Sequence, residues 1–150
     1  MKPLFVLLGA FAASALAIQI FRGADFSLAG RIAMSVMLVF TASGHFLFVQ
    51  GMTMMIPHFI PFKRQLVYFT GVVEIAAAIG LLIPRLQHLT AWLLILFFLL
   101  ILPANIHAAI HKIDYQKATN EGAGRAYLWF RVPLQMVFIL WVHFFALEGG

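Results

Sequence analysis

The sequence has no cysteine and few charged residues, and both shortages limit what the protein can be. Without cysteine there are no disulfides, no thiolate metal ligands and no thiol redox chemistry. Only 10% of the residues are charged, whereas about 25% are charged in an average soluble domain. The hydrophobic share is 63%, more than a chain of 150 residues can bury in a core of its own. These numbers exclude a soluble globular domain, a nucleic-acid-binding module and a disordered tail, and they indicate an integral membrane protein.

Familiar catalytic motifs are also absent. The chain has no P-loop, no GxGxxG, no HExxH, no GxSxG and no pair of carboxylates spaced for hydrolysis. The net charge of +5 comes from lysines and arginines scattered between apolar runs, where such residues set topology and contact anionic headgroups. We therefore expect no enzymatic activity from this chain on its own.

Five apolar runs are long enough to cross a membrane as helices. Each has about 19–22 residues, close to the roughly 20 that span about 30 Å of hydrocarbon. None shows the alternating pattern of a membrane barrel strand. The runs cover residues 3–21, 28–49, 65–83, 86–107 and 126–147. The sequence predicts an all-α integral membrane bundle of five transmembrane helices, forming a single domain over residues 1–150.

The first run also has features of a signal peptide. Lys2 precedes it, and the triplet Ala15-Leu16-Ala17 fits a cleavage site. The apolar stretch continues past this triplet to Phe21, which gives it spanning length. We expect the segment to be kept as a helix whose small residues suit close packing. Cleavage would leave the other four helices in the same orientation.

The basic residues are divided unequally between the two sides of such a bundle. One side receives Arg22, Arg31 and Arg85. The other receives seven, namely Lys2, Lys63, Arg64, Lys112, Lys117, Arg125 and Arg131. Because cytoplasmic segments carry an excess of lysine and arginine, this bias predicts a cytoplasmic N-terminus and an external C-terminus.

Polar side chains lie at membrane depth in four of the five runs. Burying an ionisable residue there costs free energy, so each one suggests a function. We expect six polar side chains to form a pocket open to the cytoplasm: His45, Glu74, Asn105, His107, Arg131 and Gln135. The expected anchor of this pocket is an interaction between Glu74 and Arg131, direct or through Gln135 or a histidine.

Three interpretations of this cluster stay open. The Glu74–Arg131 pair locks the helix packing, or the pocket binds a quinone, a lipid headgroup, a small solute or a proton. In the third, Arg131 reaches the membrane interface while Glu74 stays protonated and alone. His45 and His107 have side chains that ligate metals, but they lack a spacing motif, so we expect no metal site. The methionine-rich stretch 51–58 is interpreted as an interfacial segment stiffened by prolines rather than a copper site.

Five short motifs occur in the order seen in DoxX-like membrane proteins. They are Thr41-Ala42-Ser43-Gly44-His45-Phe46, Met54-Met55-Ile56-Pro57, Thr70-Gly71-Val72-Val73-Glu74 leading to Gly80-Leu81-Leu82-Ile83-Pro84, Pro103-Ala104-Asn105 and Arg131-Val132-Pro133-Leu134-Gln135. The chain resembles this family of small bacterial membrane proteins over about residues 30–145. The first run is an addition to the usual four-helix core. The motifs fall on five of the six pocket residues, all except His107.

The resemblance implies a bacterial inner-membrane protein that works beside quinones and redox partners. The family is similar to the small membrane subunit of an archaeal thiosulfate:quinone oxidoreductase, and related members are associated with oxidative-stress complexes. It implies a non-catalytic accessory subunit, with a quinone or a lipid in the pocket and a membrane or redox protein as partner. In that picture Arg131, Gln135 and His45 donate hydrogen bonds to a carbonyl, and Glu74 orients the arginine or relays a proton.

Two other functions stay open at this stage. The first is an assembly factor or chaperone that offers its helix faces to partner helices, as distant animal relatives of the family do. The second is a transporter of a small solute or of protons, which is disfavoured because no inverted repeat or broken-helix pair is visible. A homo-oligomer is compatible with each of these functions.

Overall fold

The computed structural model describes residues 2–21, 23 and 25–149, so Arg22, expected on the outer side, lies outside the described residues. The elements are α1 (Lys2–Phe21), α2 (Phe26–Leu47), α3 (Val49–Met55), α4 (Lys63–Gly80), α5 (Gln87–Ile110), the 3-10 turn η1 (Arg125–Tyr127), α6 (Leu128–Val142) and the π-helical η2 (His143–Glu148). The described residues form no strand, only an isolated bridge between Asp114 and Thr119. The expected all-α class is confirmed.

Among the described residues, four helical stretches are long and apolar enough to cross a membrane. They are α1, α2, α5 and the continuous stretch Arg125–Glu148 that η1, α6 and η2 form. The fifth expected span corresponds to α4, which has 18 residues and does not count with the other four. Three of its residues, Lys63, Arg64 and Glu74, carry charged side chains, and this lowers its mean hydropathy.

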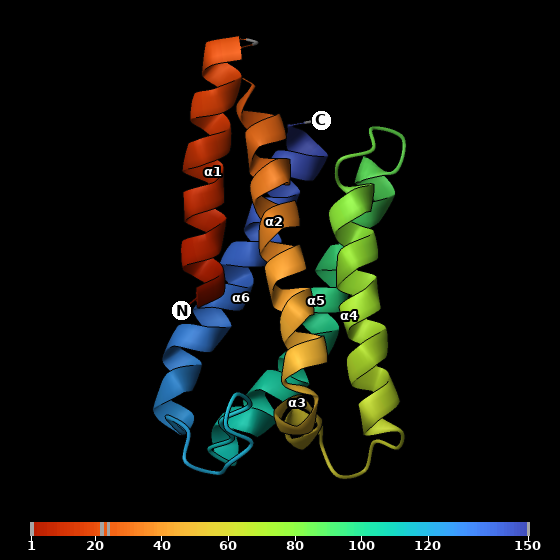
Figure 1. Cartoon of the computed structure of the whole chain (residues 1–150), viewed down its shortest axis with the longest axis vertical. Coiled ribbons are helices and arrows are strands. Elements are labelled where there is room, and N and C mark those ends of the chain that lie inside the picture. The colour runs from red at the N-terminus through yellow and green to blue at the C-terminus, as the bar shows by residue number, and fades with distance from the viewer. Residues whose placement is uncertain (1, 22, 24, 150) are drawn as a thin grey trace.

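The long helices run side by side, up and down the molecule (Figure 1). α2 packs against α1 on one side and against α4 on the other, whereas α6 and η2 contact both α5 and α2. α1 is displaced along the long axis, so that its last turns project beyond the start of α2 (Figure 1). The short helix α3 lies at the opposite end of the bundle, where it contacts α4 and α5.

Capping and helix-breaking residues set the ends of these helices. The carboxylate of Asp25 caps α2 by accepting a hydrogen bond from the backbone N–H of Leu28 at 3.0 Å. Pro57 and Pro61 lack a backbone N–H, and the helix is interrupted there between α3 and α4. Pro84 lies in the tight turn between α4 and α5, as the sequence predicts. The methionine-rich segment begins as helix α3 and ends in the proline-containing loop.

The core lies mainly between α2, α5 and α6. The largest fully buried side chains are Leu7, Met34, Met37, Leu38, Leu81, Leu94 and Val142. α2 contributes five small buried residues, which let neighbouring helices approach closely: Ala29, Gly30, Ala33, Ser35 and Ala42. α1 contributes one buried residue, Leu7, and is therefore a peripheral helix of the bundle.

Gln87 joins three helical segments at the end of the bundle opposite α3. Its Oε1 accepts a hydrogen bond from Nη1 of Arg31 at 2.6 Å, and its Nε2 donates to the carbonyl of Ala146 at 2.7 Å. The side chain is buried, so Gln87→Ala strands both partners, and we expect the free energy of unfolding to fall by about 2 kcal/mol. Unfolding in mixed micelles measures this loss. The exposed Gln65→Ala is the matched control, with an expected change under about 0.5 kcal/mol. Equal losses in both variants would contradict the bridging role of Gln87.

Candidate functional site

The six residues expected to form one pocket are distributed over four separate contacts. His45 contacts Glu74, and Asn105 contacts Arg131. His107 and Gln135 each bind a backbone carbonyl. The expected Glu74–Arg131 interaction is therefore wrong. The packing of the helices explains why. Glu74 lies on α4, which packs chiefly against α2, whereas Arg131 lies on α6, which packs against α5.

The first contact is a buried pair between α2 and α4. Nε2 of His45 lies 3.4 Å from Oε2 of Glu74, and the hydroxyl of Thr41 donates to the same oxygen at 3.2 Å. Nδ1 of His45 lies 3.1 Å from the carbonyl oxygen of Val67 and 3.0 Å from the hydroxyl of Thr70. A carbonyl oxygen can only accept, so the Val67 contact places a proton on Nδ1 and turns Nε2 toward the carboxyl group. These contacts of Glu74 with His45 and Thr41 connect α4 to α2.

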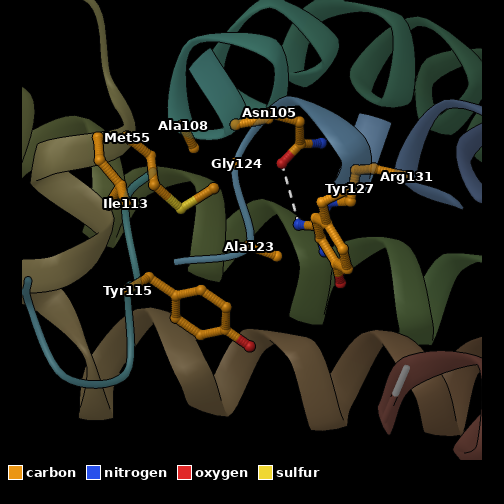
Figure 2. Close-up of a pocket in the computed structure, with 10 residues that line it drawn as sticks. Met55, Asn105, Ala108, Ile113, Tyr115, Ala123, Gly124, Tyr127 and Arg131 are labelled. Carbon is orange, nitrogen blue, oxygen red and sulfur yellow. Dashed lines mark hydrogen bonds between the residues drawn. The ribbon is translucent and has the colours of Figure 1, made fainter. Parts of the chain in front are cut away.

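The second contact lies at the edge of a cavity of about 50 Å³ between the end of α5, the loop after it and the start of α6 (Figure 2). About 10–15 Å³ by this measure holds one water molecule, so the cavity has room for a compact polar group. Four of the ten lining residues are polar, namely Asn105, Tyr115, Tyr127 and Arg131. Arg131 is the charged residue among them.

Arg131 is held at the cavity wall by neutral partners. Its Nη2 donates to Oδ1 of Asn105 at 3.0 Å, and its guanidinium carbon lies 5.9 Å from the ring centre of Tyr127. Figure 2 shows Asn105 on one side of this guanidinium and the Tyr127 ring beside it. Within the described part of the chain, the ion pairs involve Glu74 and Glu148, and none involves Arg131. A guanidinium has five N–H donors, so Arg131 has donors left for a ligand.

Gln135 belongs to the packing of α6 on α5 and does not line the cavity. Its Nε2 donates to the carbonyl oxygen of Phe98 at 2.9 Å. This carbonyl lies just over one turn before Pro103, whose missing N–H interrupts the backbone ladder of α5. Figure 1 shows α5 bending near its C-terminal end, toward α3. The amide of Gln135 therefore ties α6 to a buried carbonyl of α5 next to Leu99, the residue whose carbonyl loses its helical donor at Pro103.

Three histidines gather where the loop after α3 meets the end of α5. The ring centres of His107 and His111 are 4.1 Å apart, and the ring centre of His58 lies 5.8 Å from the first and 6.5 Å from the second. Nδ1 of His107 lies 3.0 Å from the carbonyl oxygen of Met55, which attaches α3 to α5. Among the residues that the structure describes, no group of three or more His, Asp or Glu side chains is arranged to hold a metal ion. His45 lies apart from these three histidines, in the contact with Glu74.

A family model described as a domain of unknown function, DUF8561, matches residues 34–146, about three quarters of the chain. The chain belongs to this DUF8561 family. The match starts within α2 and ends within η2, so the DUF8561 region contains all six expected site residues and leaves out α1. No curated protein and no solved structure matches the chain.

Sequence reasoning missed several polar residues of this DUF8561 chain. His58 and His111 lie outside the apolar runs, and the four-residue spacing of His107 and His111 is the signal that identifies them as neighbours. Thr41 precedes His45 by four residues, so the same helical spacing places it beside the pair. Tyr127 precedes Arg131 by four residues, so helical spacing also places it beside the guanidinium. Tyr115 reaches the cavity from the polar loop, and no helical period relates it to Arg131.

Proposed function

We propose that the protein is a DoxX-like, non-catalytic accessory protein of the bacterial inner membrane, working beside a quinone-linked redox or oxidative-stress system. The observation that carries this proposal is the cavity beside Arg131, where a guanidinium, an amide and two phenols surround space for a polar group. Asn105 and Arg131 also lie in two of the motifs on which the DoxX resemblance rests. The proposed ligand is the polar head of a membrane-soluble molecule, a quinone or a lipid, whose oxygen atoms accept hydrogen bonds from Arg131.

In this proposal α4 is the fifth transmembrane helix, and the N-terminus is cytoplasmic. Eighteen residues extend about 27 Å at 1.5 Å per residue, close to the thickness of the hydrocarbon layer. Lys63 and Arg64 lie in the first turn of α4, where long side chains reach headgroups. Glu74 is buried against His45 and is shielded from lipid. The cavity then lies at the cytoplasmic end of the bundle.

Arg131→Ala tests the ligand-binding role. The purified protein is expected to carry a stoichiometric quinone or lipid, detected by an absorbance spectrum and by mass spectrometry of organic extracts. Because Arg131 supplies the charged donors, its loss is expected to lower the retained ligand about tenfold. Arg85→Ala makes the same change of charge in the exposed turn between α4 and α5 and is expected to retain the ligand. Bulk lipid alone, equal in both variants, would contradict the proposal.

The accessory role also requires a protein partner. Mild crosslinking in membranes followed by purification is expected to enrich a redox protein over the amount captured by an unrelated helical bundle. Enrichment of newly made membrane proteins of many kinds would instead favour an assembly factor.

A further inference from the structure

The walls of the cavity beside Arg131 offer hydrogen-bond donors and a positive charge, but no acidic residue lines them in the described chain. The polar residues of the wall are Arg131, Asn105, Tyr115 and Tyr127, and the guanidinium of Arg131 supplies the charge and N–H donors. Asn105 uses its Oδ1 to hold Arg131, so its amide nitrogen stays available. A cavity of this kind suits a group that consists of acceptors and is negatively charged.

A second cation lies beside the cavity. A Cβ placed on Gly124, which lines the cavity, would lie 3.4 Å from Cγ and 3.5 Å from Cε of Lys112. The side chain of Lys112 therefore runs along the backbone of Gly124. Two acidic residues belong to the same loop. Oδ1 of Asp114 accepts hydrogen bonds from the backbone N–H groups of Gln116 and Lys117 at 3.1 and 3.3 Å, and Glu121 is exposed. Asp114 is thus engaged within the loop, while Arg131 and Lys112 stay free to bind a ligand.

We propose that this cavity binds a phosphate group that carries no attached cation, such as the headgroup phosphate of an anionic phospholipid. The inference rests on the proposed ligand-holding role and names the chemical class of the ligand. A phosphate oxygen accepts charge-assisted hydrogen bonds from a guanidinium, and arginine matches its geometry. Basic pockets between transmembrane helices on the cytoplasmic side bind the headgroups of anionic lipids in the same way. A neutral carbonyl would leave the charges of Arg131 and Lys112 without a counterion.

The size of the cavity agrees with this ligand. Its volume of about 50 Å³ exceeds the space of a single water several times and suits a compact tetrahedral head. The small residues Ala108, Ala109 and Gly124 form part of the wall. A choline group attached to the phosphate would bring a third positive charge beside Arg131 and Lys112, which disfavours a zwitterionic lipid.

The test uses the full chain, purified in detergent and freed of lipid. Phosphatidylglycerol, phosphatidylcholine or inorganic phosphate is added, and binding is followed by native mass spectrometry and by thermal unfolding. Phosphatidylglycerol is expected to be retained and to raise the Tm, whereas phosphatidylcholine does neither. Arg131→Gln is expected to weaken phosphatidylglycerol binding about tenfold and Lys112→Gln about threefold, while Arg131→Lys, which keeps the charge but not the planar group of donors, weakens it less than Arg131→Gln. Arg85→Gln removes the same charge in the exposed turn between α4 and α5, and it is expected to bind phosphatidylglycerol like the wild type.

The same data distinguish a lipid headgroup from free phosphate as the ligand, and they test the inference. Displacement of the lipid by inorganic phosphate supports recognition of the phosphate group itself, and retention of phosphatidylglycerol alone supports recognition of the lipid headgroup. Equal binding of both phospholipids, or equal losses in Arg131→Gln and Arg85→Gln, overturns the inference. Lys112 is exposed, so Lys112→Gln decides the matter where Arg131→Gln does not fold. A stoichiometric quinone in place of phospholipid overturns this inference while the proposed function stands, and the absence of any ligand overturns both.

Discussion

Glu74→Ala is expected to lower the free energy of unfolding by about 3 kcal/mol, because it removes one partner of a buried pair. Glu74 is almost fully buried, and its carboxyl group contacts both Nε2 of His45 and the hydroxyl of Thr41. Alanine leaves these two polar groups facing a small cavity between α2 and α4. Glu74→Gln can place its amide nitrogen where Oε2 lies, where it donates to Nε2 and to the oxygen of Thr41 while the Thr41 hydroxyl donates to the carbonyl of Leu38, so its expected loss is below about 1 kcal/mol. Reversible unfolding in mixed micelles compares the three proteins.

The chain provides an exposed counterpart of this pair as a control. Nδ1 of His143 lies 3.7 Å from Oε1 of Glu148, and these side chains are 47% and 59% exposed. Exposed ion pairs contribute little, so Glu148→Ala is expected to change the free energy of unfolding by less than about 0.5 kcal/mol. A loss at Glu74→Ala no larger than at Glu148→Ala would show that the buried pair does not hold α2 against α4.

Gly51→Ala is expected to displace the loop that covers the cavity and to cost about 3 kcal/mol of stability. A Cβ on Gly51 would overlap the backbone carbonyl of Tyr115, and a backbone group cannot rotate away as a side chain can. Tyr115 lines the cavity, so its displacement also removes one wall of the ligand site. Thermal unfolding measures the loss of stability, and the phosphatidylglycerol binding assay measures the loss of the site.

Gly9→Ala is the matched control for this substitution. The added Cβ meets nothing within 4 Å there, and alanine is the better helix former. The expected result is unchanged ligand binding and a gain in stability of up to about 1 kcal/mol. If Gly51→Ala behaves like Gly9→Ala, the close contact between α3 and the loop does not matter for the site.

The helices could be predicted from the sequence because each is an apolar run with a recognisable end. The expected run 86–107 corresponds to α5, which begins at Gln87 and continues to Ile110. The continuation past His107 includes Ala108 and Ala109, which favour helix, and the sequence gives no stop signal before the charged residues that follow. α3 was expected only as an interfacial segment, because seven residues show too little periodicity to distinguish helix from loop.

The site was harder to predict because the position of a residue along a helix gives its depth but not its direction. Depth in the membrane alone predicts that Glu74 and Arg131 lie together. In the structure Glu74 contacts His45 on α2, whereas Arg131 contacts Asn105 on α5. Helix contacts fix that direction, and no motif in a single sequence shows that α4 packs chiefly against α2. The contact between Asn105 and Arg131 joins two residues that depth had grouped correctly. Their grouping with Glu74 failed for lack of information about helix order.

Pro103 separates the residues of α5 that line the cavity, Asn105, Ala108 and Ala109, from the rest of that helix. Asn105 lies beyond the proline on α5 and accepts a hydrogen bond from Arg131 on α6, so two adjacent residues of the cavity wall belong to different helices. Met55 lies at the end of α3 and is tied to the same part of α5 through His107. A change in the angle of α5 at Pro103 would therefore move Asn105 and Met55, which both line the cavity, together.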